Sequence, residues 1–200
     1  MSKIVAIVGS YRRGGTTDSA VDAVLDGARK GGAEISKIYL IDRHIEFCDN
    51  CRHCTQQDGL QRGSCPKEDD VDWILRQTEE ADGLVLGAPV NFFNTTAIFR
   101  QFLERLVGYV YWPWGSKLGP VLRDKRRMKR AVLISSAAMP SFLIPFTTGA
   151  PRALRVAARM MGARPIGTLW IGQAAVEEHQ TLTAGTRARA ARLGRKLVRI

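Results

Sequence analysis

The chain has 200 residues, of which 45% are hydrophobic and 24% charged, and its formal net charge is +11. These values are typical of one soluble globular domain that can bury a core without disulfides. No apolar run approaches the length of a membrane span, and the first residues turn to glycine and polar side chains too soon for a signal peptide. We therefore expect a cytoplasmic protein without a membrane partner.

Short apolar strands alternate with amphipathic helices along the whole chain. The expected strands are 3–8, 34–41, 83–87, 131–135 and 165–171; the expected helices are 18–30, one beginning at 69–70, 95–107, 151–161 and 181–198. This alternation predicts an α/β protein with a five-stranded, doubly wound parallel sheet and helices on both faces. We expect a single domain over residues 1–200, with a cysteine-rich insertion at about 45–67.

The loop after the first strand has the composition of an anion-binding turn. It reads Gly9-Ser10-Tyr11-Arg12-Arg13-Gly14-Gly15-Thr16-Thr17 and opens a helix, whose free N–H groups attract anions. Tyr11 replaces the second glycine of a dinucleotide fingerprint, and Gly15 stands where a triphosphate loop has its lysine. We expect a monophosphate held by hydroxyls, backbone N–H groups and Arg12; the alternative is a plain turn with a helix cap.

All four cysteines fall between positions 48 and 65. Cys48, Cys51 and Cys54 are spaced by two residues each, and Cys65 follows ten residues later. In a reducing compartment such a group binds metal or does redox chemistry more often than it forms disulfides. The triplet can wrap one corner of an iron–sulfur cubane, whereas zinc sites usually space their cysteines as two separated pairs. The residues alone leave an iron–sulfur cluster, a zinc ion, a disulfide pair or no ligand open.

Three motifs resemble the NAD(P)H-dependent FMN reductases of the flavodoxin-like superfamily. The first loop of that family, Ser-x-Arg followed by small polar residues, is matched by Ser10, Arg12, Gly15, Thr16 and Thr17. Its Pro-Val-Tyr-[Phe/Trp] segment is matched in part by Pro89-Val90-Asn91-Phe92-Phe93, and its helix pattern Lys-x-Phe-[Ile/Leu]-Asp-Arg appears as Arg100-Gln101-Phe102-Leu103-Glu104-Arg105. With its cysteine spacing, the chain is similar to the iron–sulfur flavoprotein branch of the superfamily.

The resemblance implies a flavodoxin-like sheet in the order 2-1-3-4-5, bound FMN and a [4Fe–4S] cluster. FMN would be bound by Ser10, Arg12, Gly15, Thr16, Thr17, Pro89, Val90, Asn91, Phe92, Phe93, Asn94, Ser135 and Ser136. The cluster would be bound by Cys48, Cys51, Cys54 and Cys65. Asn91 departs from the family's tyrosine, and Ser135-Ser136-Ala137-Ala138 stands where the family tends to have glycines. No catalytic side chain is expected, because FMN would carry the chemistry.

The implied function is an FMN-dependent oxidoreductase. Electrons would come from a donor such as an acidic ferredoxin, pass through the cluster to FMN, and reach O2, peroxide or a quinone. The alternatives are an NAD(P)H-dependent FMN or quinone reductase without a cluster, and a non-enzymatic redox sensor.

The positive charge is concentrated in residues 123–130 and in the last helix. It indicates either solvated faces or a surface for an acidic partner. No zinc-finger, helix-turn-helix or RNA-binding aromatic signature supports nucleic acid. The resemblance implies a homodimer or homotetramer, and the aromatic segment 109–114 is expected to pack against a partner subunit.

Overall fold

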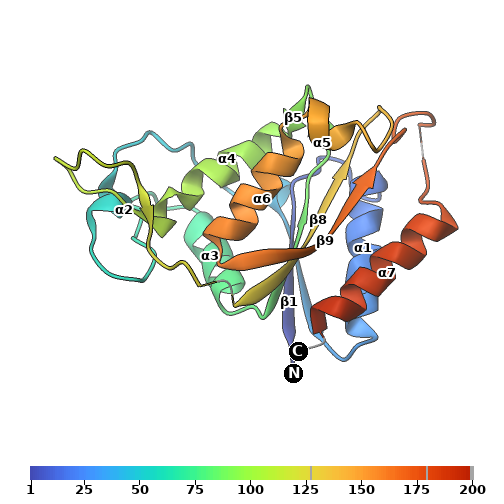
Figure 1. The fold of residues 1–200 in the computed structure, drawn as a ribbon, viewed down its shortest axis with the longest axis horizontal. Coiled ribbons are helices and arrows are strands. Elements are labelled where there is room, and N and C mark those ends of the chain that lie inside the picture. The colour runs from blue at the N-terminus through green and yellow to red at the C-terminus, as the bar shows by residue number, and fades with distance from the viewer. Residues whose placement is uncertain (127, 179, 199–200) are drawn as a thin grey trace.

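A five-stranded parallel sheet in the order β2-β1-β3-β8-β9 forms the centre of the computed structural model, which describes residues 1–126, 128–178 and 180–198 (Figure 1). Its strands are β1 (Lys3–Val8), β2 (Glu34–Tyr39), β3 (Gly83–Gly87), β8 (Lys129–Ser136) and β9 (Ala163–Ile171). Every neighbouring pair is parallel, and β1 lies between β2 and β3. The predicted strand order is therefore confirmed, with its reversal point between β1 and β3.

Helices cover both faces of the sheet (Figure 1). The helices are α1 (Thr16–Arg29), α3 (Val71–Glu79), α4 (Ala97–Arg105), α6 (Ala150–Met160) and α7 (Ala184–Val198). Side chains alternate along β1, so Val5 and Ile7 enter the core with α3, α4 and α6, whereas Ile4, Ala6 and Val8 enter the core with α1 and α7. Burial on both faces explains why the strand segments are continuously apolar.

Short elements connect these layers. They are α2 (His53–Gln56), α5 (Ile144–Thr147), the hairpin of β4 (Val90–Asn91) with β5 (Asn94–Thr95), the hairpin of β6 (Val110–Tyr111) with β7 (Val121–Leu122), and 3-10 turns at Leu40–Asp42 and Leu106–Tyr109. The helix predicted at 95–107 is shorter because Thr96 caps it by accepting a hydrogen bond from the Phe99 amide, and its last turn tightens into the 3-10 turn. None of the helices in the described ranges is long and apolar enough to cross a membrane.

Candidate functional site

The loop between β1 and α1 leaves the start of α1 open to an anion. Gly15 is the N-cap residue and offers no side-chain cap to the first amides of the helix. Thr17 is buried, and its hydroxyl lies 2.7 Å from that of Ser136 at the end of β8. Ser10 is held in the loop by bonds to the backbone of Arg12 at 3.1 and 3.2 Å. Arg12 was predicted to bind the phosphate. Its guanidinium instead donates to the carbonyl of Glu178 at 2.8 Å.

Hydrogen bonds join this first loop to the segment between β3 and α4. The Thr96 hydroxyl donates to the Gly9 carbonyl at 2.5 Å, and the Tyr11 hydroxyl accepts from the Ile98 amide at 3.1 Å. The buried hydroxyls of Thr95 and Ser135 have no partner among the described residues. Buried polar groups are rarely left unpaired in proteins without a ligand. The predicted residues of three loops are thus brought to one edge of the sheet, with two hydroxyls available to a bound group.

The hairpin of β4 and β5 presents two phenylalanines in a strained turn. Phe92 and Phe93 have φ angles of 45° and 65°, in a region that glycine and asparagine normally occupy in two-residue hairpins. Phe92 is 94% exposed, and the Phe93 carbonyl is held by the Gly149 amide at 2.8 Å. Such strain is typical of functional sites. The sequence indicated these residues only through the family motif, and it did not predict the positive φ angles of the turn.

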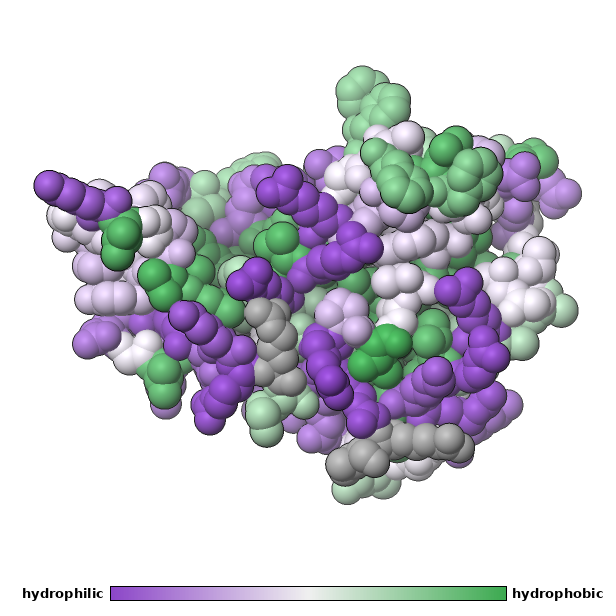
Figure 2. Space-filling model, viewed as in Figure 1, coloured by the Kyte–Doolittle hydropathy of each residue, from purple (hydrophilic) through white to green (hydrophobic). Residues whose placement is uncertain are grey.

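Apolar side chains gather beside this hairpin. Figure 2 shows a hydrophobic group at the top of the molecule, over β5 and α5. The exposed phenylalanines of the hairpin and of the segment around α5 are Phe92, Phe93, Phe142 and Phe146, here called the phenylalanine patch. Contiguous exposed apolar residues mark ligand-binding or protein-interaction surfaces.

The cysteine-rich insertion is a loop closed at its base. The Asp70 carboxylate accepts from the His44 amide at 2.8 Å, and the Asp70 amide donates to the His44 carbonyl at 2.9 Å. One residue inward, Asp69 accepts from the Glu46 amide at 2.8 Å. These bonds bring the two ends of the loop together at the start of α3. They explain how a long segment without much regular structure keeps a defined shape.

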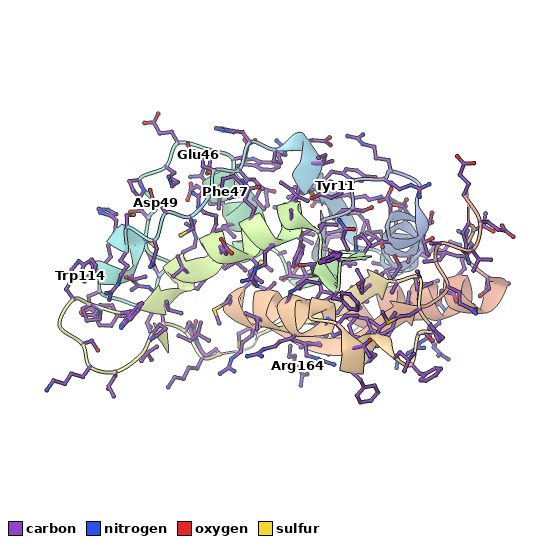
Figure 3. The ribbon with its side chains drawn as sticks, turned by 90° about the horizontal axis from the view of Figure 1, so that it is seen from above. Tyr11, Glu46, Phe47, Asp49, Trp114 and Arg164 are labelled. Carbon is purple, nitrogen blue, oxygen red and sulfur yellow. The ribbon has the colours of Figure 1, made fainter. Side chains whose placement is uncertain are left out.

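The cysteine loop and the first loop lie at opposite ends of α4. Figure 3 shows Tyr11 near the start of this helix and Asp49 and Trp114 around its other end. A helix rises about 1.5 Å per residue, so the nine residues of α4 hold its ends about 14 Å apart. Both loops follow carboxyl ends of strands, as predicted, but within one chain they form separate sites.

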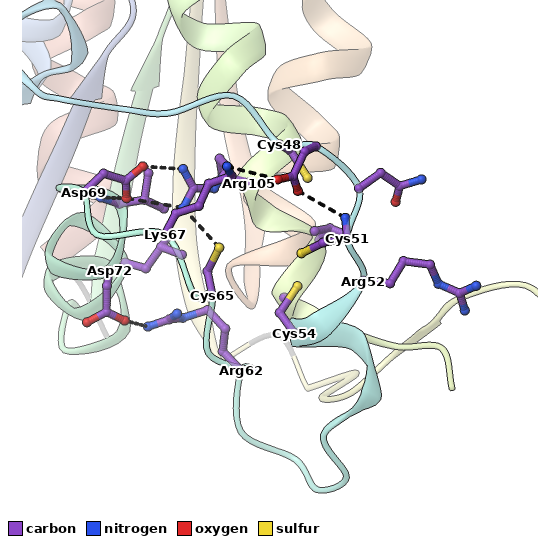
Figure 4. A pocket seen from close by; sticks show the side chains of 17 residues that line it. Cys48, Cys51, Arg52, Cys54, Arg62, Cys65, Lys67, Asp69, Asp72 and Arg105 are labelled. Atoms are coloured by element: carbon purple, nitrogen blue, oxygen red, sulfur yellow. Dashed lines mark hydrogen bonds and ion pairs between the residues drawn. The ribbon is translucent and has the colours of Figure 1, made fainter. Parts of the chain in front are cut away.

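The four cysteines line one pocket. Figure 4 shows their sulfur atoms turned toward a common space, with Cys65 facing Cys51 and Cys54 across it. Cys54 is buried, Cys51 is exposed, and Cys48 and Cys65 are half-buried. Burial raises the pKa of the Cys54 thiol, and the neighbouring cysteines raise it further because adjacent thiolates repel one another. A positive group beside Cys54 would favour its thiolate.

The four cysteines line a shared space and are not drawn to a single point. Within the described ranges, no three His, Cys, Asp or Glu side chains are grouped closely enough to hold one metal ion. A zinc ion requires its sulfurs within about 2.3 Å of one point. In a [4Fe–4S] cluster each cysteine binds a different iron, so the ligands surround a volume instead. Four cysteines around one pocket supply the number and kind of ligands that a [4Fe–4S] cluster takes.

Arg105 and Asp69 support this pocket and were not predicted as site residues. The buried Arg105 side chain forms an ion pair with Asp69 and donates to the Cys65 sulfur at 3.3 Å. Burial acts to raise the pKa of Asp69, but hydrogen bonds from Arg105 and from the Glu46 and Val71 amides outweigh it and lower the pKa below its usual range. The ion pair therefore stays charged beside the cysteines.

The aromatic segment expected at a subunit contact packs on the cysteine loop of its own chain. The Arg52 guanidinium lies between the rings of Trp112 and Trp114, 3.7 and 3.9 Å from their centroids, and donates to the Trp112 carbonyl at 2.6 Å. Arg52 has a φ of 62°, and this stacking holds it in that conformation. The Trp112 amide also donates to the Thr55 carbonyl at 2.9 Å. The segment is thus a support for the loop that carries Cys51 and its neighbours.

Arg123, the first residue of the predicted basic run, is buried and holds the cysteine loop by hydrogen bonds. Its buried guanidinium donates to the carbonyls of Cys54, Gly59 and Gly108 at 2.9 to 3.1 Å. The same region needs Gly63, because a Cβ there would lie 1.9 Å from the Cys54 carbonyl oxygen. Arg127 of this run and Arg199 of the last helix lie outside the described residues.

We expect Arg123→Lys to destabilise the cysteine loop. A lysine cannot reach all three carbonyls, and each buried acceptor left unpaired costs about 1–3 kcal/mol. Thermal unfolding should begin several degrees lower, and limited proteolysis should cut the loop first. Arg126→Lys is the control, because Arg126 is exposed and its ion pair within the described part of the chain is with Asp124. Equal stability of the two variants would contradict the bracing role.

The profile of the family described as NADPH-dependent FMN reductase matches residues 2–141. Curated relatives include an iron-sulfur flavoprotein of Archaeoglobus fulgidus, 33% identical over 111 residues that cover 56% of this chain and 48% of the relative. Another is an iron-sulfur flavoprotein of Methanocaldococcus jannaschii, 36% identical over 103 residues that cover 52% and 51%. The chain spans about half the length of these curated relatives.

Solved structures share the fold. An azoreductase from Bacillus anthracis superposes with a TM-score of 0.70 at 14% identity, covering 98% of this chain and 100% of the other. An NAD(P)H:quinone oxidoreductase from Methanothermobacter marburgensis superposes with a TM-score of 0.64 at 18% identity, covering 100% and 97%. The family profile matches well over half of the chain and spans the motifs that suggested the resemblance. The chain belongs to the NADPH-dependent FMN reductase family.

Proposed function

We propose that this protein is an FMN-dependent oxidoreductase that carries a [4Fe–4S] cluster and takes electrons from an acidic donor protein. The observation that carries the proposal is the convergence of Cys48, Cys51, Cys54 and Cys65 on one pocket. The printed names of the curated relatives, iron-sulfur flavoproteins, support it. The terminal acceptor would be a small oxidant such as O2, peroxide or a quinone.

The loops at the edge of the sheet suit FMN. The open start of α1 and the hydroxyls of Thr16 and Thr17 would hold the phosphate. The unpaired hydroxyls of Thr95 and Ser135 would donate to or accept from the rest of the cofactor. The segment Pro89–Asn94 would line the ring.

When bound, the cluster would accept single electrons and FMN would pass electrons on singly or in pairs. The protein's own side chains would hold the cysteine loop in place and shield the cluster from water. Asp69 and Asp70 fix the ends of the cysteine loop, Arg123 and Arg52 fix its interior, and Cys54 is withdrawn from water. Cys51, by contrast, is exposed and marks the side from which a donor would approach.

An acidic electron donor is proposed from the charge of the protein. The net charge is +11, and complementary charge speeds the encounter of redox partners. We expect the rate of reduction by a reduced acidic ferredoxin to fall by about tenfold between about 0.05 and 0.5 M salt, as the screening length shortens. Reduction by a neutral photoreductant is the control and should change little. A ferredoxin rate that does not depend on salt would argue against this donor.

A homodimer or homotetramer is also proposed. The phenylalanine patch supports it, because large apolar patches exposed on a monomer are typical of interaction surfaces. Light scattering of the FMN-loaded protein would test it, and a monomer at micromolar concentration would contradict it.

The second candidate function is an NAD(P)H-dependent FMN or quinone reductase without a cluster. The description of the matching family, NADPH-dependent FMN reductase, favours it. Anaerobic mixing separates the two. Rapid bleaching of the flavin by NADPH in the wild type and in Cys51→Ser alike would support the reductase. Bleaching by reduced ferredoxin that is lost in Cys51→Ser would support the cluster enzyme.

A further inference from the structure

A guanidinium is buried against one of the four cysteines. The side chain of Arg105 is 2% exposed, and its Nη2 lies 3.3 Å from the sulfur of Cys65 (Figure 4). Its Nη1 donates to the Glu46 carbonyl at 2.8 Å and to Asp69. Hydrogen bonds from both terminal nitrogens hold the guanidinium toward the pocket.

The position on α4 makes this placement unusual. Phe99, Phe102 and Arg105 recur at a spacing of three residues on the buried face of the helix. An apolar residue would continue the core at that point. Burying an ion pair there costs desolvation that a hydrophobic residue avoids, and such pairs are often no more stabilising than an apolar replacement. Packing alone therefore does not explain the buried charge of Arg105.

The other cations that line the pocket have partners of their own: Arg52 stacks on Trp112 and Trp114. Arg62 pairs with Asp72 and Glu79 at 2.8 Å each, and Lys67 pairs with Asp49 at 3.1 Å. Among the described residues, Arg105 is the one cationic side chain with a hydrogen bond to a cysteine sulfur.

We propose that Arg105 is a positioning residue that orients Cys65 and raises the reduction potential of the cluster. The inference rests on the proposed cluster. In the step concerned, the donor would lose one electron and the bound cluster would gain it, with no proton transferred and no bond broken. Added negative charge spreads onto the sulfur ligands, and a donor aimed at one of them stabilises the reduced state more than the oxidised state. The protein thereby makes the cluster easier to reduce.

Asp69 acts in the opposite sense. Its carboxylate binds Arg105 and also accepts from the Glu46 and Val71 amides, so it fixes the guanidinium while offsetting part of its charge. Removing Arg105 takes away a positive charge and a hydrogen bond, whereas removing the charge of Asp69 leaves the guanidinium less neutralised. Electrostatics thus predicts opposite shifts for the two partners of one ion pair.

The test is a redox titration of anaerobically prepared holoprotein, followed by electron paramagnetic resonance, with iron and sulfide measured on the same samples. We expect Arg105→Gln to shift the cluster to a more negative potential, Arg105→Lys to shift it less, and Asp69→Asn to shift it to a more positive potential. Arg62→Gln is the matched control, because Arg62 lines the pocket without a sulfur contact; its shift should be the smallest. If Arg105→Gln does not fold, the double variant R105Q/D69N removes both charges, and it should still lie below the wild type because the sulfur hydrogen bond is gone.

The outcomes are distinct. Potentials that do not move in Arg105→Gln and Asp69→Asn, with wild-type iron content, overturn the inference while leaving the cluster in place. Shifts of the same sign in both variants also overturn it, because they indicate a general loosening of the loop. A wild type without iron and sulfide overturns the proposed function and this inference with it.

Discussion

Cys51→Ser is expected to remove iron and sulfide from the protein while leaving FMN bound. Cys51 is exposed, so the substitution removes no core packing and should change the stability of the metal-free protein by no more than about 0.5 kcal/mol. A serine hydroxyl is a much poorer iron ligand than a thiolate, so the proposed cluster would lose one of its four protein ligands. Iron, acid-labile sulfide and flavin analysis of anaerobically purified protein would measure the effect.

Ser64→Ala is the control for this substitution. Ser64 is exposed on the same loop beside Cys65, where its hydrogen bonds among the residues described are with Gln57. It should keep its iron, sulfide and flavin at wild-type levels. A Cys51→Ser protein that also keeps its full iron and sulfide would show that Cys51 is not a ligand.

Thr16→Asp is expected to weaken FMN binding by about 100-fold, or about 3 kcal/mol. Thr16 is the first residue of α1, where a carboxylate would stand against the phosphate and repel it. The same carboxylate interacts favourably with the helix dipole, so the stability of the apoprotein should not fall. Fluorescence titration of the apoprotein with FMN would give the affinity.

Riboflavin provides the control, because it lacks the phosphate. Its affinity should be the same for the wild type and for Thr16→Asp, and Thr16→Ser should bind FMN nearly as the wild type does. A parallel loss of riboflavin and FMN binding would contradict the assignment of the phosphate to this loop.

The sheet could be predicted because its signals are local. Continuously apolar strands and amphipathic helices depend on residues close in sequence, and strand order followed from the family motifs. Element ends were less accurate, since they depend on particular contacts. The cap of Thr96, for example, starts α4 later than the hydrophobic pattern indicated.

The candidate site was predictable only in part. The cysteine spacing identified the four residues that the structure gathers, including the distant Cys65. The roles of Arg105 and Arg123 could not be predicted, because they depend on contacts across 40 and 69 residues of sequence. The signal for Arg105 was a charge at the next position of an apolar helix face, after Phe99 and Phe102. For Arg123 the surrounding basic residues favoured a surface position, and the tertiary structure buried it.

The proposed function requires one chain to hold an iron–sulfur cluster in its cysteine loop and FMN at the edge of its sheet. The most direct test is the content of iron, acid-labile sulfide, zinc and FMN in protein purified without oxygen. We predict a brown protein with about four iron and four sulfide per chain, the composition of a [4Fe–4S] cluster, together with FMN. A yellow protein with FMN but without iron and sulfide, or with one zinc per chain in their place, would contradict the proposed function.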